Sequence, residues 1–226
     1  MGQLPLPLQL ADHAVFDSFL PSGNEALVAT LVEVAAGSGA GCWLWGGAAT
    51  GKTHLLQAVC ERAGDYSVYV PLQLYSAAGP GVVQGLATRA IVCIDDIDGV
   101  AGDARWEEAL FELCNQIIDA DGQLVVAAAS APRESSIKLP DLRSRLSRLP
   151  VFHLQPLDED QRVAALQLRA RHRGLDLPAD TARFMLNRSR RDMASLYQLL
   201  DKLDLEALRA KRRLTIPFVS EVLRQS

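Results

Sequence analysis

The most constraining feature of this 226-residue sequence is a run of small residues between an apolar stretch, Cys42–Trp45, and a helical pattern. The run consists of Gly46, Gly47, Ala48, Ala49, Thr50, Gly51, Lys52 and Thr53. Small residues let successive backbone N–H groups turn toward one phosphate, and the following helix N-terminus faces the same anion. In such a loop the lysine reaches the β- and γ-phosphates and the threonine hydroxyl can bind Mg²⁺. The sequence therefore predicts a nucleotide phosphate site over residues 46–53.

A second apolar stretch, residues 91–94, ends in two carboxylates, Asp95 and Asp96. Beside a phosphate loop, Asp95 is expected to hold Mg²⁺ through water and Asp96 to orient an attacking water. Asp96 is one methylene shorter than the glutamate more common at this place. The pair therefore favours nucleotide binding more firmly than efficient hydrolysis. The alternative is a solvated strand end without a ligand.

Continuous apolar runs alternate with helical patterns over the first two thirds of the chain. The runs cover residues 42–45, 66–70, 90–94, 124–128 and 151–154, and a typical helical pattern covers residues 105–120. Runs that do not alternate with polar residues are typical of strands covered on both faces. The sequence therefore predicts an α/β fold in which helices sandwich an open parallel sheet.

The pattern changes at Pro156, after which four short helical stretches follow and no strand is expected. Charge changes at the same place. Residues 1–155 carry 9 Lys and Arg against 17 Asp and Glu, whereas residues 156–226 carry 14 against 10. We expect an extended tail over residues 1–12, an α/β domain over 13–155 and a small helical domain over 156–226. The basic balance of the helical domain indicates either a nucleic-acid contact or arginine-solvated helices.

Composition excludes several classes of protein. Hydrophobic residues make up 49% of the chain and charged residues 22%, which excludes a disordered chain. No 18 apolar residues run together, and the first residues lack the basic start of a secretion signal. The cysteines lie far apart in apolar stretches, as buried thiols of a reducing cytoplasm do. They are Cys42, Cys60, Cys93 and Cys114.

The chain resembles the AAA+ ATPases in four features. They are the phosphate loop, its continuation His54-Leu55-Leu56, the acid pair Asp95 and Asp96, and a helical lid after the sheet. Within the AAA+ ATPases it resembles the replication initiator DnaA, and more closely the Hda proteins, DnaA-related regulators that inactivate DnaA. The closer likeness includes residues 3–8, 16–19 and 214–219. The resemblance implies ADP or ATP as cofactor, with ADP favoured, and His54 at the nucleotide. It leaves no residues for the duplex-binding or N-terminal interaction domains of DnaA.

The same resemblance implies roles for residues outside the loop. Arg145, in a Ser-Arg-apolar step, is expected to be an arginine finger that acts on a neighbouring subunit's nucleotide, with Arg148 as the alternative. Arg191 matches the second sensor of the lid, and the adjacent Arg190 is expected to be solvated. The polar sensor after the fourth strand is replaced by Ala128, unless Ser130 takes its place. The N-terminal segment around His13, Phe16 and Phe19 either covers the adenine or forms an apolar pack without ligand contact.

The N-terminal run Gln3-Leu4-Pro5-Leu6-Pro7-Leu8 is expected to be extended, because its prolines remove donors and fix φ. It resembles the peptide by which replication proteins dock on the sliding clamp, the beta subunit of DNA polymerase III. The resemblance implies that Gln3 hydrogen-bonds at the rim of the clamp's pocket while Leu6 and Leu8 fill it, with Leu4 among the clamp-binding residues. The alternative is a tail packed on its own domain.

These resemblances together imply a negative regulator of replication initiation. The expected protein carries nucleotide, docks on the DNA-loaded clamp, and promotes hydrolysis of DnaA-bound ATP through Arg145. It is expected to contact DNA only through the clamp and to lie in the cytoplasm near the replisome. Its oligomeric state stays open and includes a homodimer or a higher oligomer. The alternative is an AAA+ ATPase in its own right, such as a helicase loader that turns over ATP on single-stranded DNA. A weaker possibility is direct DNA binding by the basic helical domain.

Overall fold

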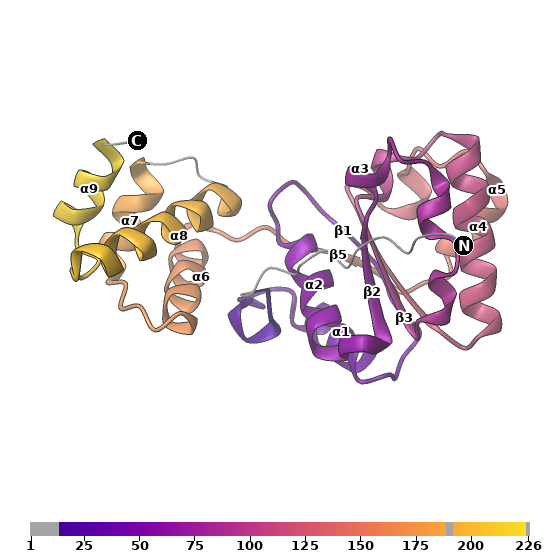
Figure 1. Ribbon diagram of the computed structural model, residues 1–226, viewed down its shortest axis with the longest axis horizontal. Coiled ribbons are helices and arrows are strands. Elements are labelled where there is room, and N and C mark those ends of the chain that lie inside the picture. Colours follow the sequence, from indigo (N-terminus) through magenta and orange to yellow (C-terminus); the bar gives the residue numbers. More distant parts are fainter. Residues whose placement is uncertain (1–13, 189–191, 225–226) are drawn as a thin grey trace. The chain divides into compact units, whose positions relative to one another are not determined.

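The computed structural model describes residues 14–188 and 192–224, and the chain divides into two compact units (Figure 1). The first unit comprises residues 14–16 and Gly23–Gln155. The second comprises Asp17–Ser22 and the described residues from Pro156 onward. The segment Asp17–Ser22 groups with the second unit although it precedes the sheet in sequence, and no change of composition marks it.

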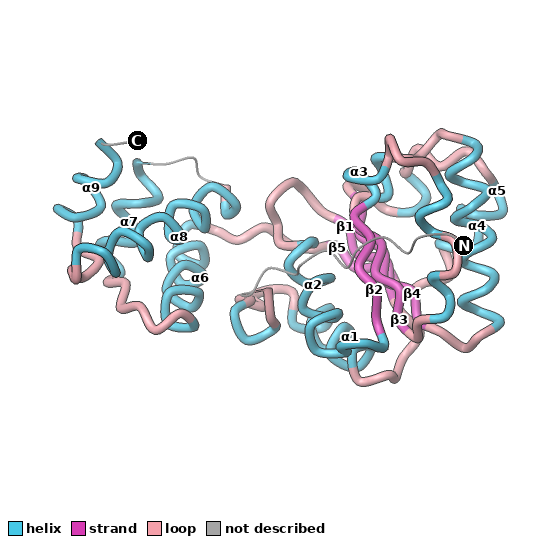
Figure 2. Tube along the Cα trace, in the orientation of Figure 1, coloured by secondary structure: helices cyan, strands magenta, loops and turns pink. Residues whose placement is uncertain are grey.

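The first unit is built on five parallel strands in the order β2-β3-β4-β1-β5 (Figure 2). Every residue of β3 and β4 is buried, as expected for strands with helices on both faces. The predicted fold class is confirmed, and each strand begins and ends within one residue of its expected bounds. The strands are β1 Cys42–Trp45, β2 Ser67–Pro71, β3 Ile91–Asp95, β4 Gln123–Ala128 and β5 Val151–His153.

Helices cover both faces of this sheet. The helices α1, Glu25–Ala35, and α2, Lys52–Ala63, lie on one face (Figure 1). The other face carries α3, Leu72–Tyr75, α4, Ala104–Asp119, and α5, Pro140–Leu146 (Figure 1). Short 3-10 turns complete the described connections: η1 Phe16–Ser18, η2 Gly64–Tyr66, η3 Pro80–Val83, η4 Leu86–Thr88, η5 Ile97–Gly99 and η6 Pro132–Glu134.

Helix α4 supplies much of the core on its face of the sheet. It begins after Asp103, whose carboxylate accepts from the backbone N–H groups of Arg105 at 2.9 Å and Trp106 at 3.3 Å. This N-cap satisfies donors that have no partner within the helix. The apolar side chains that recur along α4 pack against β1, β3 and β4, including Trp43. They are Trp106, Leu110, Leu113, Cys114 and Ile117.

The second unit contains four helices in its described part: α6 Glu159–His172, α7 Ala179–Arg188, α8 Met193–Ala210 and α9 Ile216–Arg224. Helix α6 starts with a capping box in which Asp158 and Gln161 each accept from the other's backbone N–H. Gly174, with φ of 74°, ends the helix, and Leu175 N–H donates to Ala170 O at 2.8 Å. The four helices enclose their own apolar core.

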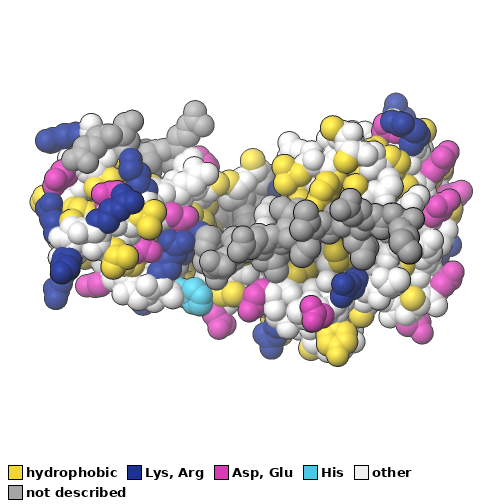
Figure 3. All heavy atoms as spheres, viewed as in Figure 1, with side chains coloured by type: hydrophobic (Ala, Val, Ile, Leu, Met, Phe, Trp, Pro, Cys, Tyr) yellow, Lys and Arg dark blue, Asp and Glu magenta, His cyan; other side chains and the backbone are white. Residues whose placement is uncertain are grey.

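Carboxylates neutralise part of the basic surplus of this second unit. Arg169 is 4% exposed, lies 4.0 Å above the ring of Tyr197, and pairs with Asp201 at 3.7 Å. Arg173 pairs with Asp201 at 2.8 Å and with Asp204 at 3.4 Å. On the face that Figure 3 shows, basic and acidic side chains intermingle over these helices. Arg169 and Arg173 therefore stabilise the helical unit through ion pairs with its own carboxylates.

One sequence-level expectation is met by the described residues. All four cysteines are free and buried, as their apolar surroundings predicted. Among residues 14–188 and 192–224, no helix combines the length and apolar character that a bilayer crossing needs.

Candidate functional site

The predicted phosphate loop leaves the carboxyl edge of the sheet, between β1 and α2. Trp45, the last residue of β1, is paired in register with Ala128 of β4 and His153 of β5. Gly46 N–H donates to Ala128 O at 3.3 Å. A Cβ at Gly46 would lie 2.9 Å from Leu154 O, so only glycine fits there. Ala49 and Gly51 have φ of 57° and 104°, and these left-handed residues turn the chain back into α2.

Lys52 closes the loop on itself. Its ammonium donates to Gly46 O and to Gly47 O, both at 2.8 Å. Burial lowers the pKa of Lys52, while the negative charges of Asp95, Asp96 and Asp98 raise it. The ammonium therefore lies inside the loop and near three carboxylates. The first N–H groups of α2 have no partner within the helix. Backbone N–H groups at the start of a helix, beside an ammonium, fit the phosphates of a nucleotide.

Asp95 is fully buried at the end of β3, and both of its oxygens accept hydrogen bonds. The hydroxyl of Tyr69, on the neighbouring strand β2, donates to Asp95 Oδ2 at 2.8 Å. The backbone N–H of Asp96 donates to Asp95 Oδ1 at 3.0 Å. Burial, followed by the charge of Asp95, raises the pKa of Tyr69. Tyr69 is therefore a fixed donor that orients the Asp95 carboxylate.

Asp96 and Asp98 complete an acidic edge beside the loop. Asp96 has φ of 53°, a left-handed conformation that turns the chain from β3 into η5. Burial, followed by the charge of Asp95, raises its pKa, and Lys52 lowers it. Asp98 Oδ2 accepts from Ala129 N–H at 2.6 Å, which ties η5 to the end of β4. Carboxylate oxygens next to a phosphate loop are the ligands that Mg²⁺ prefers, so the residues fit a magnesium-bound nucleotide. Thr53, the other expected ligand, is exposed in the first turn of α2.

Substitution of Tyr69 with phenylalanine tests its role as a positioning residue. Because the ring stays and only the donor to Asp95 is lost, nucleotide binding in EDTA should be unchanged. The gain in nucleotide affinity on adding Mg²⁺ should fall about tenfold, the size of one hydrogen bond to a charged group. Titration of a fluorescent ADP analogue with and without Mg²⁺ measures both. Tyr66→Phe, at a side chain 73% exposed, is the control. An equal change in the two variants would contradict the role.

The residue at the expected sensor position offers no polar side chain. Ala128, the last residue of β4, is completely buried. Ser130 stands two residues further on, and its backbone carbonyl accepts from Trp43 Nε1 at 3.0 Å. Whether Ser130 replaces the sensor stays a prediction. His54, which the sequence placed at the nucleotide, has its Nε2 atom 2.9 Å from Val15 O. His54 thus contacts the segment that precedes η1.

The arginine-finger candidates lie in and after α5. Arg145 is half-buried, and its guanidinium carbon lies 5.9 Å from the centre of the Phe111 ring of α4. Arg148, the alternative, is exposed just beyond the helix. Arg190 and Arg191, His13, and the clamp-binding residues Gln3, Leu4, Leu6 and Leu8 lie outside the described residues.

Sequence reasoning missed a buried carboxylate that holds α5 in place. Glu107 of α4 is 2% exposed and lies among backbone donors. Its oxygens accept from Gly102 N–H at 2.6 Å, Lys138 N–H at 3.0 and 3.1 Å, and Leu139 N–H at 2.7 Å. Lys138 and Leu139 immediately precede α5, so Glu107 fixes the start of the arginine-bearing helix. The available signal was its position next to Trp106, on the apolar side of the α4 pattern.

Comparisons with known proteins agree with this architecture. Residues 158–223 match the family described as "Hda, lid domain". Domain III of the Thermotoga maritima replication initiation protein DnaA superposes with a TM-score of 0.78 at 21% identity, over 96% of this chain and 98% of that one. AMPPCP-bound DnaA from Aquifex aeolicus superposes with a TM-score of 0.72 at 17% identity, over 96% of this chain and 70% of that one.

A second class of AAA+ motor has the same fold at a lower score. The Thermotoga maritima RuvB Holliday junction branch migration motor gives a TM-score of 0.65 at 16% identity, over 91% of this chain and 69% of that one. The fold is therefore that of the AAA+ proteins, and the family match lies in the helical unit. The chain thus joins a helical unit that matches the Hda lid family over residues 158–223 to a sheet unit with the fold of DnaA domain III.

Proposed function

We propose that this chain is an adenine-nucleotide-binding regulator of the DnaA system that restrains replication initiation. In this proposal it docks on the DNA-loaded sliding clamp and presents Arg145 to ATP bound by DnaA. The observation that carries the proposal is the lid match over residues 158–223, joined to a phosphate loop closed by Lys52. Residues 1–12 are assigned to clamp binding, residues 13–155 to nucleotide and DnaA, and residues 156–226 to the lid.

The nucleotide part of the proposal is supported by the loop geometry and by the AMPPCP-bound DnaA of similar fold. We assign Gly46, Gly47, Ala48, Ala49, Thr50, Gly51, Lys52, Thr53, His54 and Arg191 to the nucleotide, and Asp95 with Thr53 to Mg²⁺. ADP is favoured by the resemblance to the Hda proteins. Ala128, at the sensor position, cannot hydrogen-bond an attacking water with its side chain, which weakens the case for ATP turnover by this chain. Bound ADP makes the chain a partner that responds to DnaA rather than a motor.

The charge and the position of Arg145 support its assignment as the arginine finger. A guanidinium supplies a fixed positive charge to the transferring phosphoryl group. Arg145 stands on α5, whose start Glu107 holds, and its contact with Phe111 is a cation–π contact at 5.9 Å. Contacts of this kind at partly exposed sites are weak, about 0.5–1 kcal/mol, so the side chain can leave Phe111 for a stronger anion.

The deciding experiment measures hydrolysis of DnaA-bound ATP with this protein and clamp-loaded DNA. We expect stimulation that is lost in Arg145→Ala and in a variant with Gln3, Leu6 and Leu8 replaced by alanine. The tail variant should still bind nucleotide, which separates clamp docking from folding. Stimulation that persists in Arg145→Ala but disappears in Arg148→Ala would move the finger to Arg148. No stimulation by the native protein would refute the proposal.

The second candidate is an ATPase in its own right, such as a helicase loader that acts on single-stranded DNA. The observation in its favour is that Lys52, Asp95 and Asp96 are assembled at one edge of the sheet. It requires ATP turnover by this chain alone. Turnover that rises with single-stranded DNA, is unchanged by clamp and falls in Asp96→Asn would support this candidate over the regulator.

Localisation and assembly follow from the leading proposal. Its partners are the clamp and DnaA, and its contact with DNA is indirect through the clamp. We place it in the cytoplasm, associated with the nucleoid through the replisome, with a homodimer or higher oligomer as its possible assemblies.

A further inference from the structure

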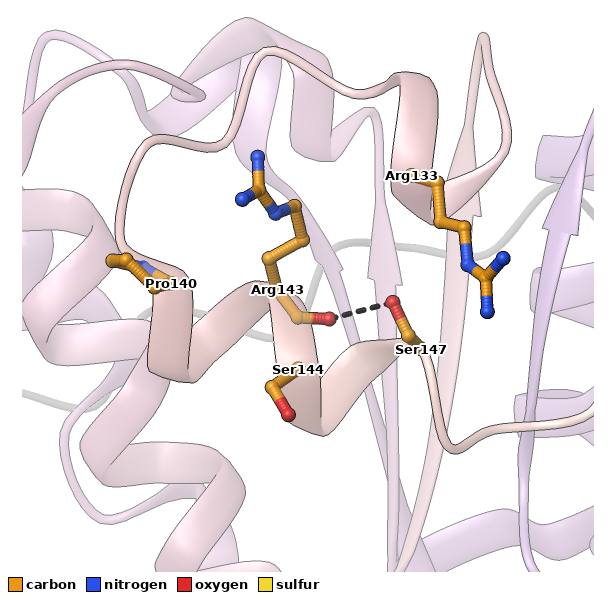
Figure 4. Close-up of a pocket in the computed structure, with 5 residues that line it drawn as sticks. All are labelled: Arg133, Pro140, Arg143, Ser144 and Ser147. Atoms are coloured by element: carbon orange, nitrogen blue, oxygen red, sulfur yellow. Dashed lines mark hydrogen bonds between the residues drawn. The ribbon is translucent and has the colours of Figure 1, made fainter.

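An open hollow of about 480 Å³ lies between η6 and α5. Two guanidinium groups and two hydroxyls line it together with a proline. Figure 4 shows Arg143 and Arg133 on either side of Ser147 in this view. The lining residues are Arg133, Pro140, Arg143, Ser144 and Ser147. None of them belongs to residues 46–53.

The sequence concentrates positive charge around this hollow. The 155 residues up to Gln155 are acidic overall, yet five of their nine Lys and Arg residues lie between positions 133 and 148. Within residues 14–188 and 192–224, no ion pair involves Arg133, Arg143, Arg145 or Arg148. Arginines that lie close together without carboxylate partners repel one another, and this repulsion destabilises the folded state. An anionic ligand would offset that cost.

Helix geometry separates these arginines by face. Pro140, Arg143, Ser144 and Ser147 recur at spacings of three and four, so they share one side of α5 and its last turn. Arg145 lies on another side, above Phe111 of α4. The arginine of α5 that faces the hollow is therefore Arg143, whatever role Arg145 has.

The backbone around the hollow is held before any ligand arrives. Ser147 Oγ donates to Arg143 O at 2.7 Å, the dashed line in Figure 4. Glu107 accepts from the N–H groups of Lys138 and Leu139, just before α5. A held backbone lowers the conformational cost of binding. Arginine forks and serine hydroxyls donate to phosphate oxygens, often in pairs. Because Ser147 Oγ already gives its proton to Arg143 O, the donors of this hollow are Arg133, Arg143 and the hydroxyl of Ser144.

We propose that this hollow is a second phosphate site, in which Arg133 and Arg143 each hold one phosphate of a polyphosphate chain. Two cations on either side of one hollow suit linked phosphates better than a single phosphate ion. They also suit a short chain better than a long nucleic acid, since the remainder of this unit is acidic and repels an extended polyanion. The polyphosphate is either free or part of a nucleotide that a neighbouring P-loop subunit presents.

Calorimetric titration with inorganic tripolyphosphate tests the free form, using the full chain with its phosphate loop filled by one equivalent of Mg·ADP. We expect one site. Arg133→Ala and Arg143→Ala should each weaken binding about tenfold, the size of one charge-assisted hydrogen bond. Lys138→Ala removes an equal charge from the same segment without touching the hollow, and should leave binding within about twofold. Equal loss in all three variants would overturn the site in favour of a diffuse field.

Sedimentation velocity tests the presented form, with the protein filled by AMPPCP or by ADP. Association that requires the longer phosphate chain and is lost in Arg143→Ala supports a neighbour's nucleotide as the source. The site is refuted if neither tripolyphosphate nor AMPPCP-dependent association depends on Arg133 and Arg143. It is also refuted if a single-stranded oligonucleotide binds there in place of tripolyphosphate. Because DnaA-bound ATP hydrolysis and Arg145 are not part of these readouts, the regulator proposal stands or falls separately.

Discussion

Replacement of Lys52 with alanine should weaken Mg·ADP binding about a hundredfold or more, since the charged interaction with the β-phosphate contributes about 3 kcal/mol. The loss has a second source in this protein. Lys52 also donates to the carbonyls of Gly46 and Gly47 at 2.8 Å, so its removal leaves the loop without its internal support. Titration of a fluorescent ADP analogue gives the dissociation constant, and far-UV circular dichroism confirms the fold.

Two further variants of lysine separate local from general effects. Lys52→Arg keeps the charge but replaces a compact ammonium that fits between two carbonyls with a planar fork. It should recover only part of the affinity. Lys138→Ala removes an exposed lysine elsewhere in the same unit and should bind ADP normally. A dissociation constant for Lys52→Ala within threefold of the native value would mean that residues 46–53 are not the nucleotide site.

Replacement of Glu107 with alanine should lower the free energy of unfolding by about 3–4 kcal/mol, because three part-buried N–H groups lose a charged acceptor that is itself buried. These donors are Gly102, Lys138 and Leu139. Glu107→Gln keeps the shape and one acceptor oxygen but brings an NH₂ group among donors, so its effect should be intermediate. Urea unfolding measures the loss, and hydrogen exchange at the same three amides shows where it arises.

Glu108 offers a matched control for this experiment. It is the next residue of α4, has the same side chain, and is exposed. Glu108→Ala should change stability by no more than about 0.5 kcal/mol, as surface substitutions usually do. If Glu107→Ala and Glu108→Ala behaved alike, the carboxylate would not support the segment before α5. The comparison also bears on the finger, because that segment fixes where α5 begins.

The sheet and the loop were predictable because the relevant signals are local. A continuous apolar run followed by glycines and a Lys-Thr step specifies strand, turn and helix within a dozen residues, and the structure places β1, the loop and α2 there. The strand bounds followed from the apolar runs for the same reason. The packing of α4 followed from its helical period, which brings Leu110 and Ile117 to one face.

The contacts that tune the site were not predictable because they depend on register and on distant segments. Tyr69 meets Asp95 only because β2 and β3 pair in parallel with Pro71 opposite Asp95. The bond from Ala129 N–H to Asp98 requires β4 to end beside η5. Two of the donors to Glu107, the N–H groups of Lys138 and Leu139, lie 31 and 32 residues away along the chain. The charge of the Glu107 side chain does not by itself indicate that the side chain is buried.

The aromatic pair at the end of β1 gives the protein an optical reporter. Trp45 stacks on His153 with ring centroids 4.0 Å apart and stands immediately before the phosphate loop. The other two tryptophans, Trp43 and Trp106, are at most 2% exposed in the core. A rearrangement of the loop would therefore change the emission of Trp45 more than that of its buried counterparts. Nucleotide exchange can be followed in real time by intrinsic fluorescence, without a label.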